Sequence, residues 1–314
     1  MSLRTVVLWM LTGVFALAGG APDGEVTAAG PKITSLVRAS WMSSASAMTE
    51  RNALDSRLSA AREGVVRLLT YNVAGLPALL SGSRPIENIP QISRLIDAYD
   101  VALVQEDFAY HRELIQHLHH AFRSPPSRAR HGFLGDGLNS FSVFPSRAFE
   151  RVGWRACNGV LGDYSDCLAD KGFTVSETTL ARGTTVHIYN VHADAGRAAD
   201  DWRARAMEFA QLANFIREHS RGQAIVVAGD TNLNDGFGDR VILQTFLNAT
   251  GLVNTCGVLE CGHETFDKVF VRSSDAIELT PLLWYWDSRF VDSHRHPLSD
   301  HPALRVDVGW RNLR

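Results

Sequence analysis

Apolar residues follow two alternating patterns from about residue 65 to the end of the chain. Short apolar runs, typical of buried strands, alternate with longer stretches in which apolar residues recur at helical spacing. The predicted strands span residues 66–73, 101–106, 140–144, 173–180, 186–192, 224–230, 265–271 and 303–306, and the predicted helices span 89–98, 112–122, 202–219 and 240–249. This alternation predicts one α/β domain over residues 65–314.

Two different patterns precede this domain. Residues 1–21 are typical of an export signal, with Arg4 ahead of an apolar run over 6–18 and small residues from Ala18 to Ala21. The apolar run is short for a membrane span, so we predict a secreted or periplasmic protein, with an uncleaved membrane anchor as the alternative. Residues 22–64 are small, polar and rich in Ala and Ser, and they predict a linker that contains a short helix.

The composition is that of a large globular domain with little overall charge. The chain has 314 residues, of which 45% are hydrophobic, and a formal net charge of −3. This length is sufficient for a sizeable buried core. The charge provides no general attraction for nucleic acid, and the sequence predicts no obligate protein partner.

The four cysteines form two local pairs, Cys157 with Cys167 and Cys256 with Cys261. In an exported protein this arrangement predicts two disulfides that close short loops. A zinc site is a weaker alternative, because the first pair lacks the close spacing of zinc ligands. Buried free thiols are the other alternative.

Polar and ionisable side chains recur where the predicted strands begin or end. These residues are Asn72, Glu106, His192, Asp230, Asn232, Asp267, Asp300 and His301. Loops at the strand ends of α/β sheets converge, so these side chains are expected to share one cleft. Taken singly, each has a structural explanation, because Asp and Asn favour turns and a histidine on a strand is often buried. Their joint occurrence favours a functional site.

These side chains suit the hydrolysis of a phosphate ester. The oxygens of Glu106, Asn72 and Asp300 are ligands that Mg²⁺ prefers, with Mn²⁺ or another divalent ion as the alternative. Phosphoryl transfer also needs a group that orients water and donors to the phosphate oxygens, and Asp230 and Asn232 fit these roles. His192 and His301 could supply protons or hydrogen bonds, with Asp267 orienting His301.

Six short motifs in this order resemble those of the deoxyribonuclease-I-like endonuclease/exonuclease/phosphatase superfamily. They are Thr70-Tyr71-Asn72-Val73, Gln105-Glu106, Asn190-Val191-His192, Gly229-Asp230-Thr231-Asn232, Asp267-Lys268-Val269-Phe270 and Ser299-Asp300-His301-Pro302. The resemblance covers about residues 65–308. It implies a four-layered α/β sandwich, in which two packed and mainly antiparallel sheets are flanked by helices, and it implies the site roles given above.

Two further stretches resemble secreted sphingomyelinases. One runs from Cys157 to Phe173 and ends in Lys-Gly-Phe, and the other follows His192 through Asp194 and Arg205. The aromatic run Trp284-Tyr285-Trp286 lies where bacterial sphingomyelinases carry an exposed hairpin that enters the membrane interface. Trp and Tyr suit such an interface. Alternatively, these residues belong to a sheet strand whose aromatic side chains pack in the core.

Three functions therefore stay open at this point. The first is a Mg²⁺-dependent phosphodiesterase that cleaves a phospholipid such as sphingomyelin, in the manner of a phospholipase C, at a membrane surface. The second is a secreted nuclease, for which Arg112, Arg123, Arg128 and Arg130 could contact a DNA backbone. The third is a non-catalytic binding protein or toxin subunit. It is disfavoured because no catalytic position that we can match has been replaced.

Overall fold

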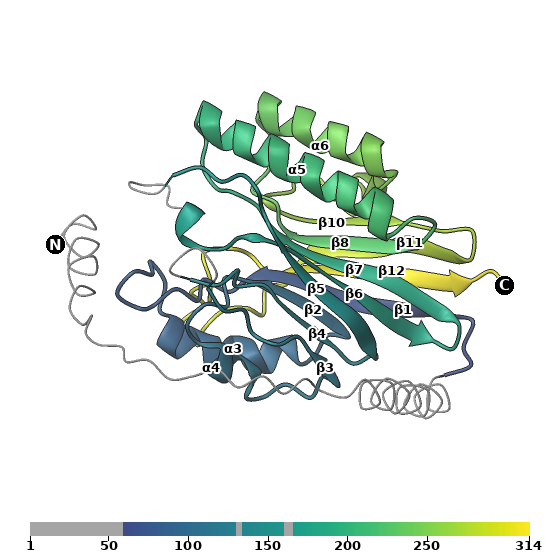
Figure 1. Ribbon diagram of the computed structural model, residues 1–314. Coiled ribbons are helices and arrows are strands. Elements are labelled where there is room, and N and C mark those ends of the chain that lie inside the picture. Colours follow the sequence, from purple (N-terminus) through teal and green to yellow (C-terminus); the bar gives the residue numbers. More distant parts are fainter. Residues whose placement is uncertain (1–58, 130–133, 160–165) are drawn as a thin grey trace, which may run out of the picture. The chain divides into compact units, whose positions relative to one another are not determined.

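The computed structural model describes residues 59–129, 134–159 and 166–314 (Figure 1). The predicted signal peptide and the predicted linker as far as residue 58 lie outside the described residues. The described chain, Ser59–Arg314, forms one compact unit. Its first strand begins at Glu63, two residues before the predicted domain boundary, because residues 63 and 64 already pair with the last strand. No helix among the described residues is both long and apolar enough to cross a membrane.

Two six-stranded sheets form the centre of this unit. In the first sheet β1 and β2 are parallel neighbours and all other neighbours are antiparallel. The strand order of this sheet is β11-β12-β1-β2-β4-β3. These strands span Ile277–Trp286 (β11), Leu304–Asn312 (β12), Glu63–Asn72 (β1), Val101–Gln105 (β2), Asn139–Ser142 (β4) and Phe122–Arg123 (β3).

The second sheet repeats this plan, since β7 and β8 are its only parallel pair among the described residues. Its strand order is β5-β6-β7-β8-β10-β9. The strands span Ser146–Gly153 (β5), Gly172–Ala181 (β6), Thr184–His192 (β7), Ile225–Asp230 (β8), Asp267–Arg272 (β10) and Val253–Asn254 (β9).

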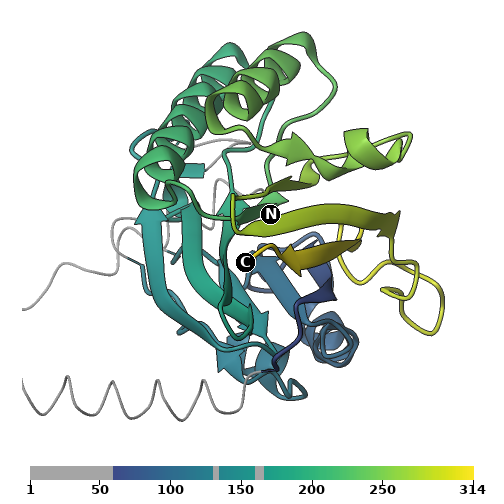
Figure 2. The ribbon, with the colours of Figure 1, turned by 90° about the vertical axis from the view of Figure 1, so that its right-hand side faces the viewer.

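Helices cover the outer face of each sheet and complete four layers (Figures 1 and 2). Helix α3 (Pro85–Ile96) and the short α4 (His111–Ile115) pack on the first sheet, and α5 (Ala199–His219) and α6 (Phe237–Thr250) pack on the second. Three apolar clusters follow from this order. One fills the space between the sheets, and each of the others fills the space between a sheet and its helices. The predicted four-layered sandwich is confirmed.

The predicted helix over 112–122 is wrong in its second half. Helix α4 ends at Ile115, and the chain then turns toward β3. Side chains of α3 take the backbone N–H groups that would continue the helix, because Ser93 accepts from His117 N at 3.2 Å and Asp97 accepts from His119 N at 2.5 Å. Tertiary contacts therefore override the local apolar spacing.

Two long edge strands, β5 and β11, were not predicted. Strand β5 is mostly exposed or half-buried and is rich in charged residues, so it has no apolar alternation. Strand β11 contains Pro281 at a bulge in its pairing with β12. A proline inside an apolar run argues against a strand in sequence terms, although edge strands tolerate it.

The aromatic run forms the end of β11 and not an exposed hairpin tip. Trp284, Tyr285 and Trp286 pair with residues of β12. Trp284 and Trp286 lie on the face that packs against the core between the sheets, and their rings meet edge to face at 4.7 Å. Tyr285 lies on the other face, where its hydroxyl accepts from Arg305 at 3.2 Å. The structure therefore agrees with the sheet-strand alternative for these half-buried residues, and a membrane contact through them stays a prediction.

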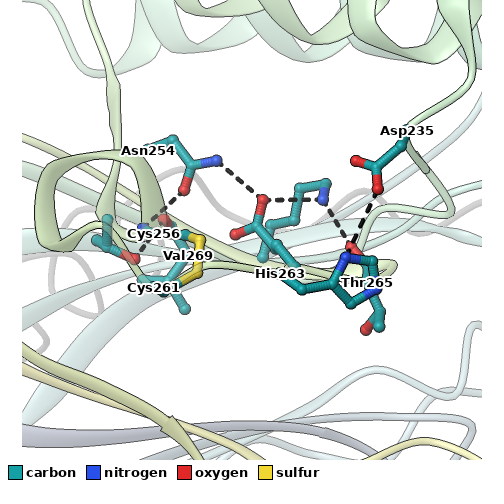
Figure 3. Close-up of a disulfide and its surroundings, with 10 residues drawn as sticks. Asp235, Asn254, Cys256, Cys261, His263, Thr265 and Val269 are labelled. Atoms are coloured by element: carbon teal, nitrogen blue, oxygen red, sulfur yellow. Dashed lines mark hydrogen bonds and ion pairs between the residues drawn. A yellow bond between two sulfur atoms is a disulfide. The ribbon is translucent and has the colours of Figure 1, made fainter.

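Both predicted disulfides are confirmed. Cys157 bonds to Cys167, and Cys256 bonds to Cys261 across the short helix α7 (Thr255–Leu259). Figure 3 shows the second disulfide beside Asn254, which accepts from Cys256 N at 3.0 Å and donates to Glu264 at 2.9 Å. Glu264 also pairs with Lys268 at 2.9 Å. The disulfide loop is thus tied to the first residues of β10.

The packing of β11 leads to a prediction about stability. Replacing Trp284 and Trp286 together by Ala should lower the free energy of unfolding by about 3–5 kcal/mol, because both half-buried rings leave the inter-sheet core. The measurement is urea-induced unfolding. Leu282→Ala on the same strand, whose side chain is exposed, is the control and should cost less than about 1 kcal/mol. An unchanged unfolding midpoint in the double variant would show that the rings lie in solvent.

Candidate active site

The catalytic candidates meet at one end of the two sheets because the strands that carry them end there. Asn72 closes β1, and Glu106 directly follows β2, its parallel neighbour. In the second sheet His192 closes β7 opposite Asp230, which closes β8, and Asp230 is in register with Asp267 on β10. The two sheets therefore present acidic and imidazole groups to each other across their interface, at the end where β1 and β8 stop (Figure 1).

Asn72 connects the two sheets at the centre of the site. Its Nδ2 donates to Glu106 Oε1 at 3.0 Å and to Asp230 Oδ2 at 3.1 Å, and its Oδ1 accepts from Ala74 N at 3.0 Å. In this arrangement the amide nitrogen faces the carboxylates. Asn72 thus positions the two acids, and its role as a metal ligand stays a prediction.

Glu106 lies in a strained position at the end of β2. Its φ of 59° is in the left-handed region, which is uncommon for a residue other than glycine and is often found at functional sites. Gly75 lies so close that a Cβ there would come within 2.5 Å of the Glu106 carbonyl. Burial raises the pKa of Glu106, and the charges of Asp230 and Asp300 raise it further, whereas Asn72 and Lys171 oppose this shift.

His192 is buried and faces both acids. Its Nε2 lies 3.5 Å from Asp230 Oδ2 and 3.9 Å from Glu106 Oε1. Burial, together with the nearby charge of Lys171, lowers the pKa of His192 well below its usual value. This imidazole is therefore neutral near pH 7 and provides a hydrogen bond without a charge.

His301 has the opposite environment. Its Nδ1 lies 2.8 Å from Asp267 Oδ2, the pairing expected from the sequence, and its Nε2 lies 3.7 Å from Asp230 Oδ2. Burial alone would lower the pKa of His301, but the carboxylates of Asp230 and Asp267 outweigh it and raise the pKa to about 10. Burial also raises the pKa of Asp267 to about 6. Near pH 7 His301 is a cation between two carboxylates.

Asp230 is the group that these side chains share. Burial would raise its pKa, yet the pKa is lowered because His301, His192 and Lys171 lie close by. Its Oδ1 accepts from Asn232 N at 3.1 Å, and Asn232 Nδ2 donates to the carbonyl of Ala193 at 2.9 Å. Asn232 has a φ of 50°, which turns the chain sharply after β8. Asp230 stays ionised at neutral pH and can accept a proton from a water molecule.

Asp300 lies at the solvent-facing side of the site. Its side chain is exposed and accepts from the Ser299 hydroxyl at 3.2 Å, and that hydroxyl also donates to the carbonyl of Asn72 at 2.7 Å. These bonds hold the Asp300–His301 segment against the end of β1.

The oxygen ligands of this site fit a hard divalent cation. Burial is the main cause of the raised pKa of Glu106, and the negative charges of Asp230 and Asp300 add to it. A cation beside Glu106 would stabilise its buried carboxylate and offset the repulsion among the three acids. Asp230, Asp267 and His301 also offer ligand atoms within 4.8 Å of one another. There, however, protonated His301 already supplies positive charge, so the position beside Glu106 is the better match.

Sequence reasoning missed two features that shape the site. Lys171 affects the pKa values of Glu106, His192 and Asp230, and its Nζ donates to the carbonyl of Ala193 at 3.3 Å. A cavity of about 330 Å³ adjoins the site, and its lining includes Lys171, Asp194, Trp154 and the Cys157–Cys167 disulfide. Trp154 Nε1 donates to the carbonyl of His192 at 2.8 Å. The Lys-Gly-Phe motif was the available signal for Lys171.

Comparison with known proteins gives related sequences and folds. The chain is 33% identical over 265 residues to sphingomyelinases of Mycobacterium tuberculosis and Mycobacterium bovis, which covers 77% of this chain. It spans 52% of the length of these relatives. No protein-family model matches the chain.

Two solved structures illustrate the range of similar folds. Beta toxin from Staphylococcus aureus, in a variant with bound magnesium ions, has a TM-score of 0.59 at 14% identity, covering 77% of this chain and 99% of that one. D. rerio TDP2 in complex with a single-strand DNA product has a TM-score of 0.58 at 14% identity, covering 79% of this chain and 100% of that one. Together with the strand order, these likenesses show that the chain has the deoxyribonuclease-I-like fold.

The pairing of His301 with Asp267 predicts the pH dependence of turnover. If protonated His301 is required, activity should persist on the alkaline side until about pH 10, the raised pKa of this imidazole. Asp267→Asn removes one of the two carboxylates that raise this pKa, so the alkaline limit should move down toward the usual histidine value of about 6.5. The measurement is kcat against pH with a soluble phosphodiester.

Asp97→Asn is the matched control for this experiment. Asp97 pairs with the exposed His119 at 2.7 Å, on the surface and outside the set of catalytic candidates. The pH profile of kcat for the Asp97→Asn variant should follow that of the parent protein. An alkaline limit that stays in place in Asp267→Asn would contradict the proposed charge state of His301.

Proposed function

We propose that this chain, a protein with the deoxyribonuclease-I-like fold, is an exported phosphodiesterase that depends on a divalent metal and cleaves a phospholipid such as sphingomyelin. The observation that carries the proposal is that Glu106, Asp230 and two histidines meet at the same end of the sheets. One of these histidines is neutral and the other is protonated. Similarity to sphingomyelinases over 77% of the chain supports the choice of lipid. The two disulfides are typical of an exported protein.

The side chains fit in-line attack by water on a phosphodiester. Asp230 orients the water and accepts its proton as the oxygen bonds to phosphorus. His301 donates its proton to the oxygen of the leaving alcohol as the phosphorus–oxygen bond breaks, and Asp267 keeps that imidazole in place. Neutral His192 and the amide of Asn232 donate hydrogen bonds to the phosphate oxygens, whose charge grows in the transition state.

Glu106 is the main ligand that we assign to the metal, with Asp300 and Asn72 as further oxygen donors. A Mg²⁺ ion bound there supplies positive charge that stabilises the phosphate. The nitrogen of Asn72 holds the Glu106 and Asp230 carboxylates near each other, so the group that would accept the proton lies beside the residue that would be the main metal ligand.

The nuclease alternative has less support from the basic residues once assigned to it. Arg123 donates to the backbone carbonyls of Leu118 and His120 and thus braces the chain before β3. Arg128 lines the cavity next to the site and remains available to a substrate, and Arg112 is exposed. The predicted contact at Arg130 lies outside the described residues. The non-catalytic alternative conflicts with the complete set of acid, base and amide groups.

A panel of substrates tests the proposed specificity. Purified protein with Mg²⁺ should release phosphocholine from sphingomyelin vesicles faster than it cleaves phosphatidylcholine, plasmid DNA or bis(p-nitrophenyl) phosphate, each assayed in parallel. Rapid cleavage of DNA, without hydrolysis of sphingomyelin or phosphatidylcholine, would favour the nuclease instead.

The metal assignment gives a separate prediction for Glu106. Glu106→Gln should lower kcat by at least about two orders of magnitude, because the amide keeps the size of the side chain but removes its charge. Chelation with EDTA should abolish the activity of the parent, and added Mg²⁺ should restore it. The free energy of unfolding of this variant, measured with urea, should lie within about 1 kcal/mol of that of the parent. This measurement distinguishes a loss of catalysis from a loss of structure. Full activity in EDTA would refute the metal requirement.

A further inference from the structure

Three large apolar side chains stand out from the described surface by their exposure. Leu79 is 95% exposed, Phe237 is 79% exposed and Ile86 is 64% exposed, the highest values among the large hydrophobic residues that the structure describes. Single exposed apolar residues are ordinary on protein surfaces. The informative feature is where these three lie.

All three lie at the catalytic edge of the sandwich. Leu79 belongs to the loop that leaves β1 after Asn72, and Ile86 lies in the first turn of α3, to which that loop leads. Phe237 is the first residue of α6, which follows β8 and Asp230. The two strands from which these segments leave meet at the site, where Asn72 Nδ2 donates to Asp230 Oδ2 at 3.1 Å. Figure 1 shows α3 and α6 on opposite outer layers. Ile86 at the start of α3 and Phe237 at the start of α6 therefore belong to segments that lead away from the site into different layers.

Further apolar side chains extend the part contributed by α6. Trp202, in the first turn of α5, is 40% exposed, and its ring lies 3.3 Å from the position that a Cβ on Gly238 would take. It therefore packs over the first turn of α6. Val241 is 49% exposed and lies one helical turn after Phe237, on the same face. We call Leu79, Ile86, Trp202, Phe237 and Val241 the apolar rim.

Hydrogen bonds hold the loop that carries Leu79. The loop before α3 forms a turn in which the N–H groups of Leu80 and Ser81 donate to the carbonyl of Pro77 at 2.7 and 3.0 Å. The Tyr110 hydroxyl accepts from Ala78 N at 3.0 Å and holds the turn from the side. Leu79 thus extends into solvent from a turn that is held by its own backbone hydrogen bonds and by Tyr110.

The chemistry of the rim fits a lipid surface. Side chains that contact a nucleic acid backbone are cationic, whereas the five side chains of the rim are aliphatic or aromatic. Two exposed arginines accompany them. Arg240 lies between Phe237 and Val241, and Arg203, which pairs with Asp200, is next to Trp202. Apolar side chains that enter the acyl boundary, beside cations at the level of the lipid phosphates, are typical of interfacial contacts.

We propose that the apolar rim docks the protein on a phospholipid membrane, with the catalytic edge facing the bilayer. This inference rests on the proposed function, because a lipid phosphodiester at a membrane surface requires the site to face that surface. The rim residues are more exposed than a side chain packed against the core, as Trp284 and Trp286 of β11 are, so the rim is the better candidate for the contact. Since the rim residues lie on segments that leave the catalytic strands into two layers, docking brings the carboxylates and histidines to the level of the lipid headgroups.

The test separates docking from chemistry. Leu79→Ser/Phe237→Ser should bind sphingomyelin–phosphatidylcholine vesicles at least about tenfold more weakly than the parent, measured by sedimentation in EDTA so that no turnover occurs. Hydrolysis of bis(p-nitrophenyl) phosphate with Mg²⁺ should be unchanged, because neither side chain belongs to the catalytic set. Val65→Ser/Leu313→Ser is the control, with two apolar residues that are 48% and 50% exposed, near the start of β1 and after β12.

Each outcome decides between docking and the alternatives. Vesicle binding equal to that of the parent, or an equal loss in the control, would overturn the role of the rim even if the parent cleaves sphingomyelin. Loss of activity on the soluble diester would place Leu79 and Phe237 in the cleft and also overturn it. A parent that cleaves DNA and no lipid would refute the proposed function, whereas rim-dependent vesicle binding would still support docking.

Discussion

A buried amide crosslink joins the two sheets just below the catalytic edge, and the geometry of the site depends on it. Asn190 of β7 donates to the carbonyls of Val104 at 2.9 Å and Asn139 at 3.0 Å, and it accepts from Gln105 at 2.7 Å. Buried amides must satisfy their hydrogen bonds, so these contacts fix how the sheets face each other. Because Gln105 precedes Glu106, and His192 follows Asn190 by one intervening residue, the same crosslink sets the position of the carboxylate relative to the imidazole.

Next to this crosslink, burial and nearby charges give the two histidines of the site different protonation states. Both approach Asp230 Oδ2, at 3.5 Å for His192 and 3.7 Å for His301. His301 also pairs closely with Asp267, at 2.8 Å, whereas the second carboxylate near His192 is that of Glu106, at 3.9 Å. Burial therefore keeps His192 neutral, while the two carboxylates beside His301 keep it charged. The position of Asp267 is secured in turn by its surroundings. Lys268 is tied to Glu264 beside the Cys256–Cys261 disulfide, and Thr231 donates to the carbonyl of Phe266.

The sequence was informative where one residue both ends an apolar run and carries a reactive group. Asn72, Glu106, His192 and Asp230 meet this condition, so the central strands and the candidate residues could be found together. Edge strands carry no such signal, as the charges of β5 and Pro281 in β11 illustrate. The motif with Asp267 pointed to a charged His301, but nothing in the sequence indicated how far burial lowers the pKa of His192. The pKa of His192 depends on burial under segments that are distant in sequence, and periodicity does not report on them.

The aromatic residues of β11 illustrate a general limit on inferring a membrane contact from composition. Trp and Tyr suit both a bilayer interface and a half-buried strand, so residue type alone does not distinguish the two. Pairing with β12 assigns Trp284 and Trp286 to the core. The exposed apolar residues instead lie on segments that leave the catalytic strands, such as the loop with Leu79 and the first turn of α6 with Phe237. The strand ends therefore carry the catalytic candidates, while the segments that follow them determine which kind of substrate surface can approach those residues.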